Sequence, residues 1–358
     1  MTMPAHELEQ RLAKADTLYA DLALDQAAVA FRDIIADIPG CYAAHLGLAR
    51  TLTRQRDHEG ARQAAMQCLA LDPDRAEGYL ALGVLQFLLD ETSEARQSLA
   101  RALELAPSDP ETLLTLAQVT ADEGDHESAL TLLGEAREAI ANSSNENERD
   151  ALLALAWHAQ TYLHLTASDN ASAREAAQEV IALGDANRYA ASLAYSNLGI
   201  LEAQQKNYEQ AIDYLEQAYE MNPHFYRAAS ALGRILVLRR QHARAAEVMA
   251  TVTEHPFSDA AMDRYVYGMA LAKSGQRDKA REQYQLALSA GLKGIFRVQA
   301  LWQTVWLSQW GRYAVIGVAL AAVLAYVLLV QPDGSAISLL VVAAVILLMQ
   351  FGLGKVRR

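Results

Sequence analysis

Cysteine is scarce in this sequence, which holds only Cys41 and Cys68 among its 358 residues. Two cysteines in a chain of this length do not form the disulfide framework of a small secreted domain, and buried free thiols are common. The N-terminal stretch MTMPAHELEQ also lacks the apolar run of a secretory signal peptide. We therefore expect no signal peptide and a reducing compartment.

The signatures of known catalytic and metal sites are missing as well. The sequence contains no HExxH, P-loop or GxSxG pattern and no paired cysteines at zinc spacing. Its nine histidines are scattered along the chain. We therefore expect no enzyme activity, no cofactor and no metal site.

The negative charge is unevenly distributed. Residues 292–358 hold six basic side chains against Asp333 alone, a balance of +5. The formal net charge of the whole chain is −12, so residues 1–291 carry a net charge of −17. An acidic body lacks the cationic footprint that nucleic-acid binding requires. We therefore expect no nucleic-acid partner.

What the sequence does contain is helical periodicity, which is clearest over residues 76–107. Small and apolar residues recur there at spacings of three and four in two segments, with a polar break at 90–93. Such spacings predict a pair of amphipathic helices, and the small residues let the two backbones approach closely. The positions expected to face each other are Tyr79, Leu82, Gly83, Ala95, Leu99 and Ala102.

The same pattern repeats along the chain. Pro39, Pro73 and Pro107 follow one another at steps of 34 residues. This period and the positions of the small, large and closing residues resemble the tetratricopeptide repeat, a helix–turn–helix unit. The resemblance covers most of the chain and implies an all-α fold, a tetratricopeptide-type α-solenoid in which helix pairs form a right-handed superhelix.

Eight repeats can be placed on this pattern. Residues 1–143 hold repeats 1–4, residues 144–190 hold the end of a polar loop and a degenerate repeat 5, and residues 191–291 hold repeats 6–8. The loop, at residues 142–147, is either a simple insertion or a flexion point between two sub-arrays, and the sequence leaves both open.

In the family, the first helix of each repeat lines a concave groove that binds a peptide or a helix of a partner. The apolar residues at these positions are Leu46, Leu80, Val84, Phe87, Leu88 and Leu114. They would suit an amphipathic partner segment. The alternative is that the array curls tightly or fills its own groove, in which case these residues belong to the core.

The later repeats offer a basic lining, in which Arg227 and Arg234 could receive a carboxylate-bearing peptide. One branch of the family clamps a partner's C-terminal carboxylate. Asn197 and Arg227 fall on two of its clamp positions, whereas His158, Tyr162 and Ala231 do not match the others. The alternative interpretation of the arginines is a solvated surface.

The C-terminal end has a different composition. Trp302, Trp306 and Trp310 recur at every fourth position within residues 292–312. This segment is either a juxtamembrane amphipathic helix at a membrane interface or the last helix of the solenoid.

Two runs without charge follow, at residues 313–330 and 335–354. They predict a transmembrane helical hairpin over residues 313–354, followed by a basic tail at 355–358. Basic residues flank the hairpin and are missing from its turn, which predicts a multi-pass protein with the solenoid facing the cytoplasm, most simply at a bacterial inner membrane.

The function that these features favour is a membrane-anchored scaffold or adaptor, which binds a protein partner through the groove and the lipid bilayer through the hairpin. The alternative is a structural subunit of an envelope-assembly, secretion or polysaccharide-export complex that docks mainly through its transmembrane hairpin.

Overall fold

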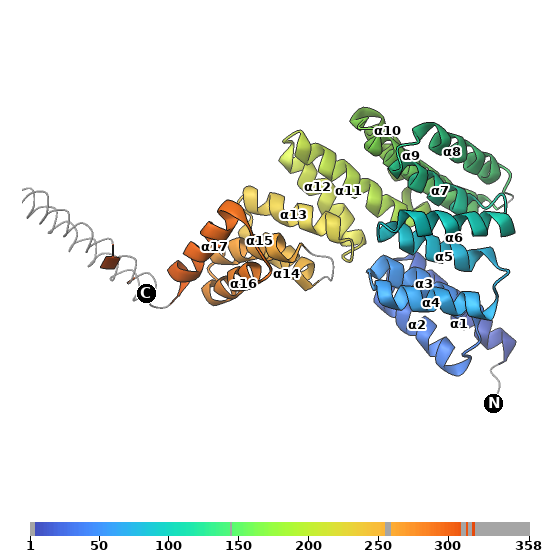
Figure 1. The fold of residues 1–358 in the computed structure, drawn as a ribbon, viewed down its shortest axis with the longest axis horizontal. Coiled ribbons are helices and arrows are strands. Elements are labelled where there is room, and N and C mark those ends of the chain that lie inside the picture. The colour runs from blue at the N-terminus through green and yellow to red at the C-terminus, as the bar shows by residue number, and fades with distance from the viewer. Residues whose placement is uncertain (1–3, 144, 255–258, 309–312, 314–316, 319–358) are drawn as a thin grey trace, which may run out of the picture. The chain divides into compact units, whose positions relative to one another are not determined.

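The computed structural model describes residues 4–143, 145–254, 259–308, 313 and 317–318. These residues form seventeen α-helices and one short 3₁₀ helix, and they contain no strand (Figure 1). The chain forms two compact units. Unit 1 comprises Met1–Arg240 with Glu254–Ser258, and unit 2 comprises Gln241–Thr253 with Asp259–Arg358.

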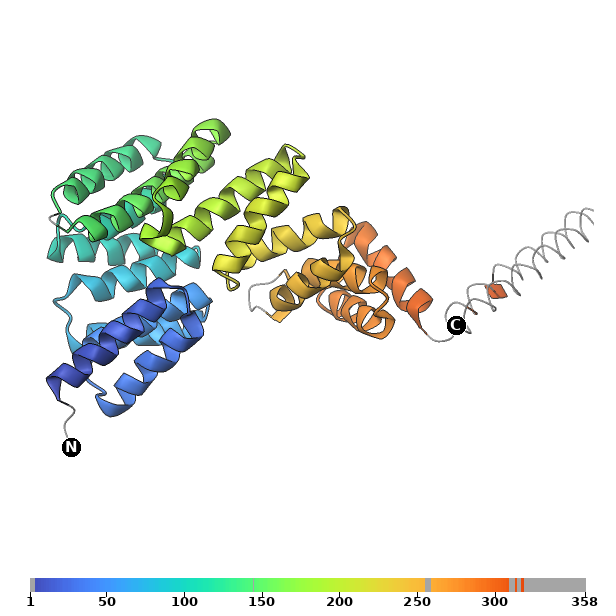
Figure 2. The ribbon, with the colours of Figure 1, turned by 180° about the vertical axis from the view of Figure 1, so that it is seen from behind.

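Consecutive helices of unit 1 pack side by side as helix–turn–helix pairs (Figures 1 and 2). The helices of unit 1 are α1 (Ala5–Ala20), α2 (Leu24–Asp37), α3 (Tyr42–Gln55), α4 (His58–Leu71), α5 (Ala76–Leu88), α6 (Thr92–Leu105), α7 (Pro110–Asp122), α8 (His126–Ala141), α9 (Glu146–Thr166), α10 (Asn170–Ala182), the 3₁₀ helix η1 (Gly184–Asn187), α11 (Arg188–Gln204), α12 (Tyr208–Met221) and α13 (Tyr226–Leu238). Unit 2 contains α14 (His242–Glu254), α15 (Ala260–Lys273), α16 (Arg277–Ser289) and α17 (Gly294–Leu307). The predicted all-α solenoid of helix pairs is confirmed.

In three of the pairs, a glycine on the first helix meets a large residue on the second. A Cβ atom at Gly83 would lie 2.8 Å from the side chain of Leu99, and one at Gly199 would lie 2.5 Å from that of Leu215. These separations are shorter than any real Cβ contact, so glycine is what allows the two helices to approach. The spacing of small residues in the sequence therefore marks the contact between the two helices of a pair.

The turn inside each pair contains one residue with a left-handed backbone. The residues with positive φ at the seven turns that lie within one unit are Leu22, Arg56, Asp90, Gly124, Ser168, Lys206 and Gly275. Only two of the seven are glycines, although glycine adopts this conformation at the lowest cost. The packing of the two helices therefore fixes the turn against the local preference of the chain.

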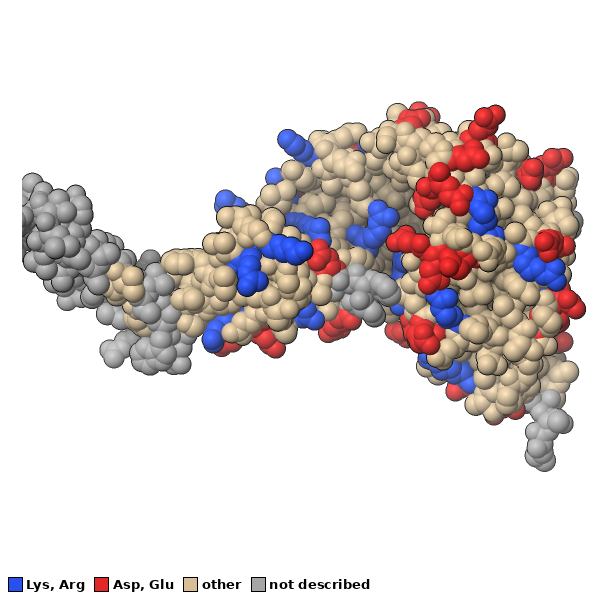
Figure 3. Space-filling model, in the orientation of Figure 1, with Lys and Arg blue, Asp and Glu red and all other residues tan. Residues whose placement is uncertain are grey.

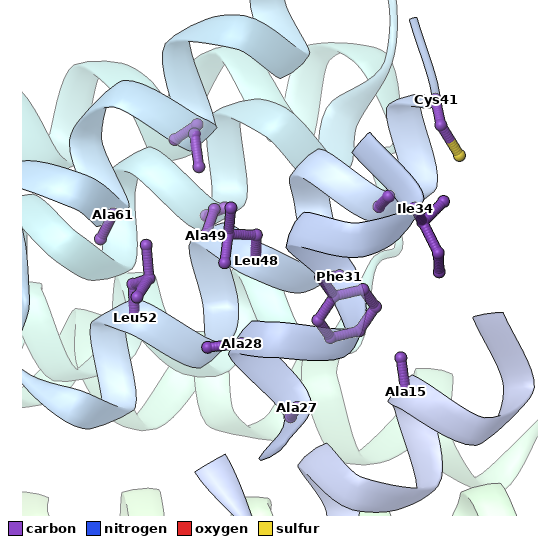
Figure 4. Close-up of a cluster of buried hydrophobic side chains, with 14 of the residues drawn as sticks. Ala15, Ala27, Ala28, Phe31, Ile34, Cys41, Leu48, Ala49, Leu52 and Ala61 are labelled. Atoms are coloured by element: carbon purple, nitrogen blue, oxygen red, sulfur yellow. The ribbon is translucent and has the colours of Figure 1, made fainter. Parts of the chain in front are cut away.

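The N-terminal core is built around Phe31, whose side chain is fully buried among residues of α1, α2 and α3 (Figure 4). Alanines such as Ala28 and Ala49 surround it and keep the helices close. Both cysteines are buried and free. Burial raises the pKa of the Cys68 thiol to about 12, which keeps it protonated and unreactive.

The degenerate fifth repeat is a full helix pair, α9 and α10. Helix α9 is 21 residues long and packs against both α7 and α8, sharing one apolar cluster with them. The apolar core thus joins the helices before and after the polar segment at 142–147, and both lie inside unit 1. The division between the two units comes later, after Arg240, within the predicted repeats 6–8.

The predicted membrane topology needs correction. No helix of the described residues is long and apolar enough to cross a membrane. This finding overturns the predicted multi-pass membrane protein with its cytoplasmic orientation. Of the hairpin predicted over residues 313–354, only Tyr313, Gly317 and Val318 are described, and the remainder and the basic tail lie outside the described residues. The prediction rests only on the composition of two uncharged runs in the sequence. None of the described helices supports it.

Candidate partner-binding surface

The first helices of the repeats form one continuous inner layer of unit 1. Each of them contacts the first helix of the next repeat, in the order α1, α3, α5, α7, α9, α11 and α13. The second helices flank this layer, each packing on its own first helix. Side chains on the open side of the inner layer can therefore act together, even when they are far apart in the sequence. Acidic and basic side chains are interspersed on the face of unit 1 seen in Figure 3.

Arg54, near the end of α3, contacts both α1, the first helix of the inner layer, and α11, its sixth. Its guanidinium carbon lies 3.8 Å from the ring centroid of Tyr19 on α1 and 4.2 Å from that of Tyr189 on α11. A guanidinium stacked between two aromatic faces gains cation–π attraction on both sides. An imidazole nitrogen of His224, before α13, also lies 3.8 Å from a carboxylate oxygen of Asp25 on α2. The array curls until Tyr189 of α11 lies against Arg54 of α3.

Tyr162 on α9 is the meeting point of several inner helices. Its ring packs edge-on against Phe87 of α5, with centroids 5.9 Å apart. Its hydroxyl donates a hydrogen bond to Asp122 of α7 over 2.6 Å. Burial raises the pKa of Tyr162 and Asp122 raises it further, whereas the positive charge of Arg227 on α13 acts in the opposite direction. Three inner helices, α5, α7 and α9, thus meet at one side chain.

Several buried polar atoms on inner helices have no hydrogen-bond partner among the described residues, and two of them lie on α9 and α11. Neither Nδ1 of His158 nor the hydroxyl oxygen of Ser196, which is only 1% exposed, has a hydrogen bond. Burial lowers the pKa of His158 to about 4, so that its imidazole is neutral near neutral pH. Both atoms are buried, so they belong to the interior of the helix array and are not accessible to a bound segment.

A second cluster of polar side chains consists of Asp16 on α1, Arg50 on α3 and Glu111 on α7. A guanidinium nitrogen of Arg50 lies 3.9 Å from a carboxylate oxygen of Glu111. Burial raises the pKa of Asp16 on α1, and the charge of Arg50 partly offsets this effect. Among the described residues no group of three His, Cys, Asp or Glu side chains could hold a metal ion.

The residues predicted to line the groove differ in their exposure. Leu80 and Leu114 are buried in the core, at 5% and 4% exposure. The half-buried positions are Leu46, Val84, Phe87, Leu88 and Asn197. Arg227 and Arg234 are exposed on α13. The structure therefore places Phe87 against Tyr162, and it buries Leu80 and Leu114 in the core.

The sequence did not single out Tyr19, Arg54 and Tyr189. Tyr19 and Arg54 occupy inner positions of their repeats, which was the available signal. The contact between Arg54 and Tyr189 joins residues 135 positions apart in the sequence. Among the predicted interface tryptophans, Trp302 and Trp306 are exposed on α17, and Trp310 lies outside the described residues.

Comparison with solved structures shows the same fold in other proteins. A chain of the APC/C hetero-tetramer Cut9-Hcn1 is 16% identical with a TM-score of 0.55, over 82% of this chain and 55% of that one. The human IFIT1 dimer with PPP-AAAA gives 17% identity and a TM-score of 0.51, over 86% of this chain and 68% of that one. This chain thus spans only about half the length of the first of these relatives. At such identities the likeness shows the fold alone.

Family models give a more direct result, whereas a comparison with curated proteins finds no match. Models described as tetratricopeptide repeat match residues 12–68, 67–110, 158–224 and 202–264. Together these matches cover more than half of the chain, and they fall on the helix pairs of the solenoid. The chain therefore belongs to the tetratricopeptide repeat family, whose architecture is suited to binding other proteins.

Proposed function

We propose that the protein is a scaffold that holds a segment of a partner protein on the inner layer of unit 1. The segment presents an apolar side chain to Phe87 and Tyr162 and a carboxylate to Arg227. One observation carries this proposal: Phe87 of α5 packs edge-on against Tyr162 of α9, whose hydroxyl bonds to Asp122 of α7, so that three inner helices meet at one half-buried aromatic pair.

The chemistry of this group fits a peptide that is apolar and acidic in turn. Half-buried aromatic rings and an arginine are the residue types that contribute most to protein interfaces. The Arg227 guanidinium can hold a carboxylate through two parallel hydrogen bonds. The half-buried Val84 and Leu88 extend the apolar part along α5. An amphipathic or extended segment is therefore the expected ligand class.

The experiment compares matched variants of the full chain in co-purification from cells of its source. Phe87→Glu and Arg227→Glu place a negative charge on the proposed surface. Leu130→Glu on α8, where the side chain is 53% exposed, and Arg101→Glu on α6 make the same changes on second helices. Leu80 is not a suitable target, because a charge at a buried position would disrupt the fold itself.

We expect both inner variants to lose the same partner, and both control variants to keep it at the level of the unchanged chain. Far-UV circular dichroism of all four proteins checks that the helices are intact. A partner that remains bound to both inner variants would overturn the proposal. So would a partner that is lost equally from inner and control variants, because binding would then not depend on this surface.

A further inference from the structure

Helix α17 carries an exposed apolar stripe that no described part of unit 2 covers. Ile295, Val298, Trp302 and Val305 follow one another at spacings of three, four and three, and so lie on one side of the helix. The side chains of this stripe, between 36% and 62% exposed, are Ile295, Val298, Leu301, Trp302, Val305 and Trp306. Contiguous exposed apolar surface of this kind marks an interaction site.

The opposite side of α17 is held against unit 2, which fixes the direction in which the stripe points. Ala300 is fully buried, and Phe296 packs edge-on against Tyr265 of α15, with ring centroids 5.4 Å apart. The Tyr265 hydroxyl donates a hydrogen bond to the Gln299 side chain. Helix α17 is therefore anchored on one side, and its apolar stripe faces away from the α15 and α16 core.

The charges on α17 itself and on its neighbours in the sequence are all of one sign. From Gln283 to Pro332 the sequence has no acidic residue, whereas Lys293 and Arg297 are exposed at the start of α17. The part of the surface around the C-terminal end of α17 that is seen in Figure 3 carries no charged side chain. The rings of Trp302 and Trp306 stack 6.0 Å apart within the stripe. Indole rings favour the boundary between apolar chains and water.

We propose that α17 lies with this apolar stripe along a lipid surface that carries anionic headgroups. The tryptophans and aliphatic side chains enter the boundary of the acyl chains, and Lys293 and Arg297 pair with the headgroups. The helix lies along the surface and crosses nothing, so the proposal is separate from the multi-pass topology corrected above. It is also independent of the scaffold function proposed for unit 1.

A second copy of the chain fits the stripe less well. The spacing resembles the seam of a paired helix, but such pairs are selected by acidic and basic residues that flank the seam. The flanking residues of α17 include Arg297 and no acidic residue, so two α17 helices would bring like charges together. A lipid surface with anionic headgroups supplies the missing negative charge.

The experiment follows tryptophan emission from the full chain. The variant Trp157→Phe with Trp310→Phe leaves Trp302 and Trp306 as the emitting residues. It is mixed with vesicles of phosphatidylcholine, or of phosphatidylcholine and phosphatidylglycerol, whose acyl chains carry bromine as a quencher. We expect a blue shift and quenching with the anionic vesicles. Replacing Lys293 and Arg297 by Gln should weaken this binding about 30-fold, at about fivefold for each basic residue near an anionic surface.

Two further variants make the test specific. Val298→Gln with Val305→Gln should abolish the quenching, whereas Val29→Gln on α2, where the side chain is 56% exposed, should leave it unchanged. Emission that is blue-shifted before vesicles are added and insensitive to them would overturn the proposal, because the chain itself then covers the stripe. Unquenched emission together with a dimer that Val298→Gln removes would assign the stripe to a second copy. Quenching that stays unchanged in both the basic and the valine variants would also overturn the proposal.

Discussion

The left-handed residue in each repeat turn offers the sharpest test of the fold. Lys206, between α11 and α12, has a φ of 66°, whereas Gly124, between α7 and α8, has a φ of 87°. A residue other than glycine in this conformation costs about 1–2 kcal/mol. Glycine avoids that cost but loses about 0.5–1 kcal/mol more conformational entropy on folding. Lys206→Gly should therefore stabilise the protein by about 0.5–1 kcal/mol, the difference between these two effects.

Gly124→Ala is the reverse change at the equivalent turn. A Cβ atom at Gly124 would meet nothing within 4 Å, so the whole effect comes from the backbone. We expect a loss of about 0.5–1 kcal/mol. Lys206→Ala is the matched control, because it removes the side chain while keeping the strained conformation, and it should be close to neutral.

The measurement is urea unfolding followed by circular dichroism, combined with hydrogen exchange of the amides in the affected helix pair. Exchange is needed because repeat arrays can open one part at a time, so that a single unfolding transition averages over the chain. A stabilisation by Gly124→Ala, or a destabilisation by Lys206→Gly, would refute the account of the turns. So would equal effects of Lys206→Gly and Lys206→Ala.

Three further predictions concern packing, pH and the curled inner layer. Gly199→Ala should cost about 1–3 kcal/mol in urea unfolding, because its Cβ would overlap Leu215, whereas Gly134→Ala, with open space around it, should gain about 0.5–1 kcal/mol. The pKa of His158 is lowered from 6.5 to about 4, so between these pH values the unfolded chain binds a proton at His158 that the folded chain does not. The melting temperature should therefore fall as pH drops from 6.5 towards 4, and His158→Gln should make this dependence on pH less steep. Arg54→Ala removes two cation–π contacts and should speed hydrogen exchange at the start of α11, where Arg54→Lys should restore part of the protection. A dependence of the melting temperature on pH that His158→Gln leaves unchanged would contradict the second prediction. Amide protection in Arg54→Ala equal to that of the unchanged chain would contradict the third.

The helix pairs and their period could be predicted from the sequence because they depend on near neighbours. The positions of Gly83, Leu99 and Gly199 follow from spacings of three and four on single helices, and all three lie buried at the contact between paired helices. The groove could be predicted only in part. Leu80 and Phe87 occupy equivalent sides of α5 in the sequence, yet only Leu80 is withdrawn into the core. How deeply a side chain is buried depends on which later helix covers it.

The sequence by itself determined the all-α repeat fold, because each repeat encodes its own helix pair through local periodicity and small residues. Only the tertiary structure decided that the inner layer curls until Tyr189 meets Arg54, and that Phe87 and Asp122 contact one tyrosine, Tyr162. It also showed that the apolar stripe of α17 remains exposed. Small rotations between successive repeats add up along the array, so contacts across more than 100 residues depend on the sum of all of them and on no single motif.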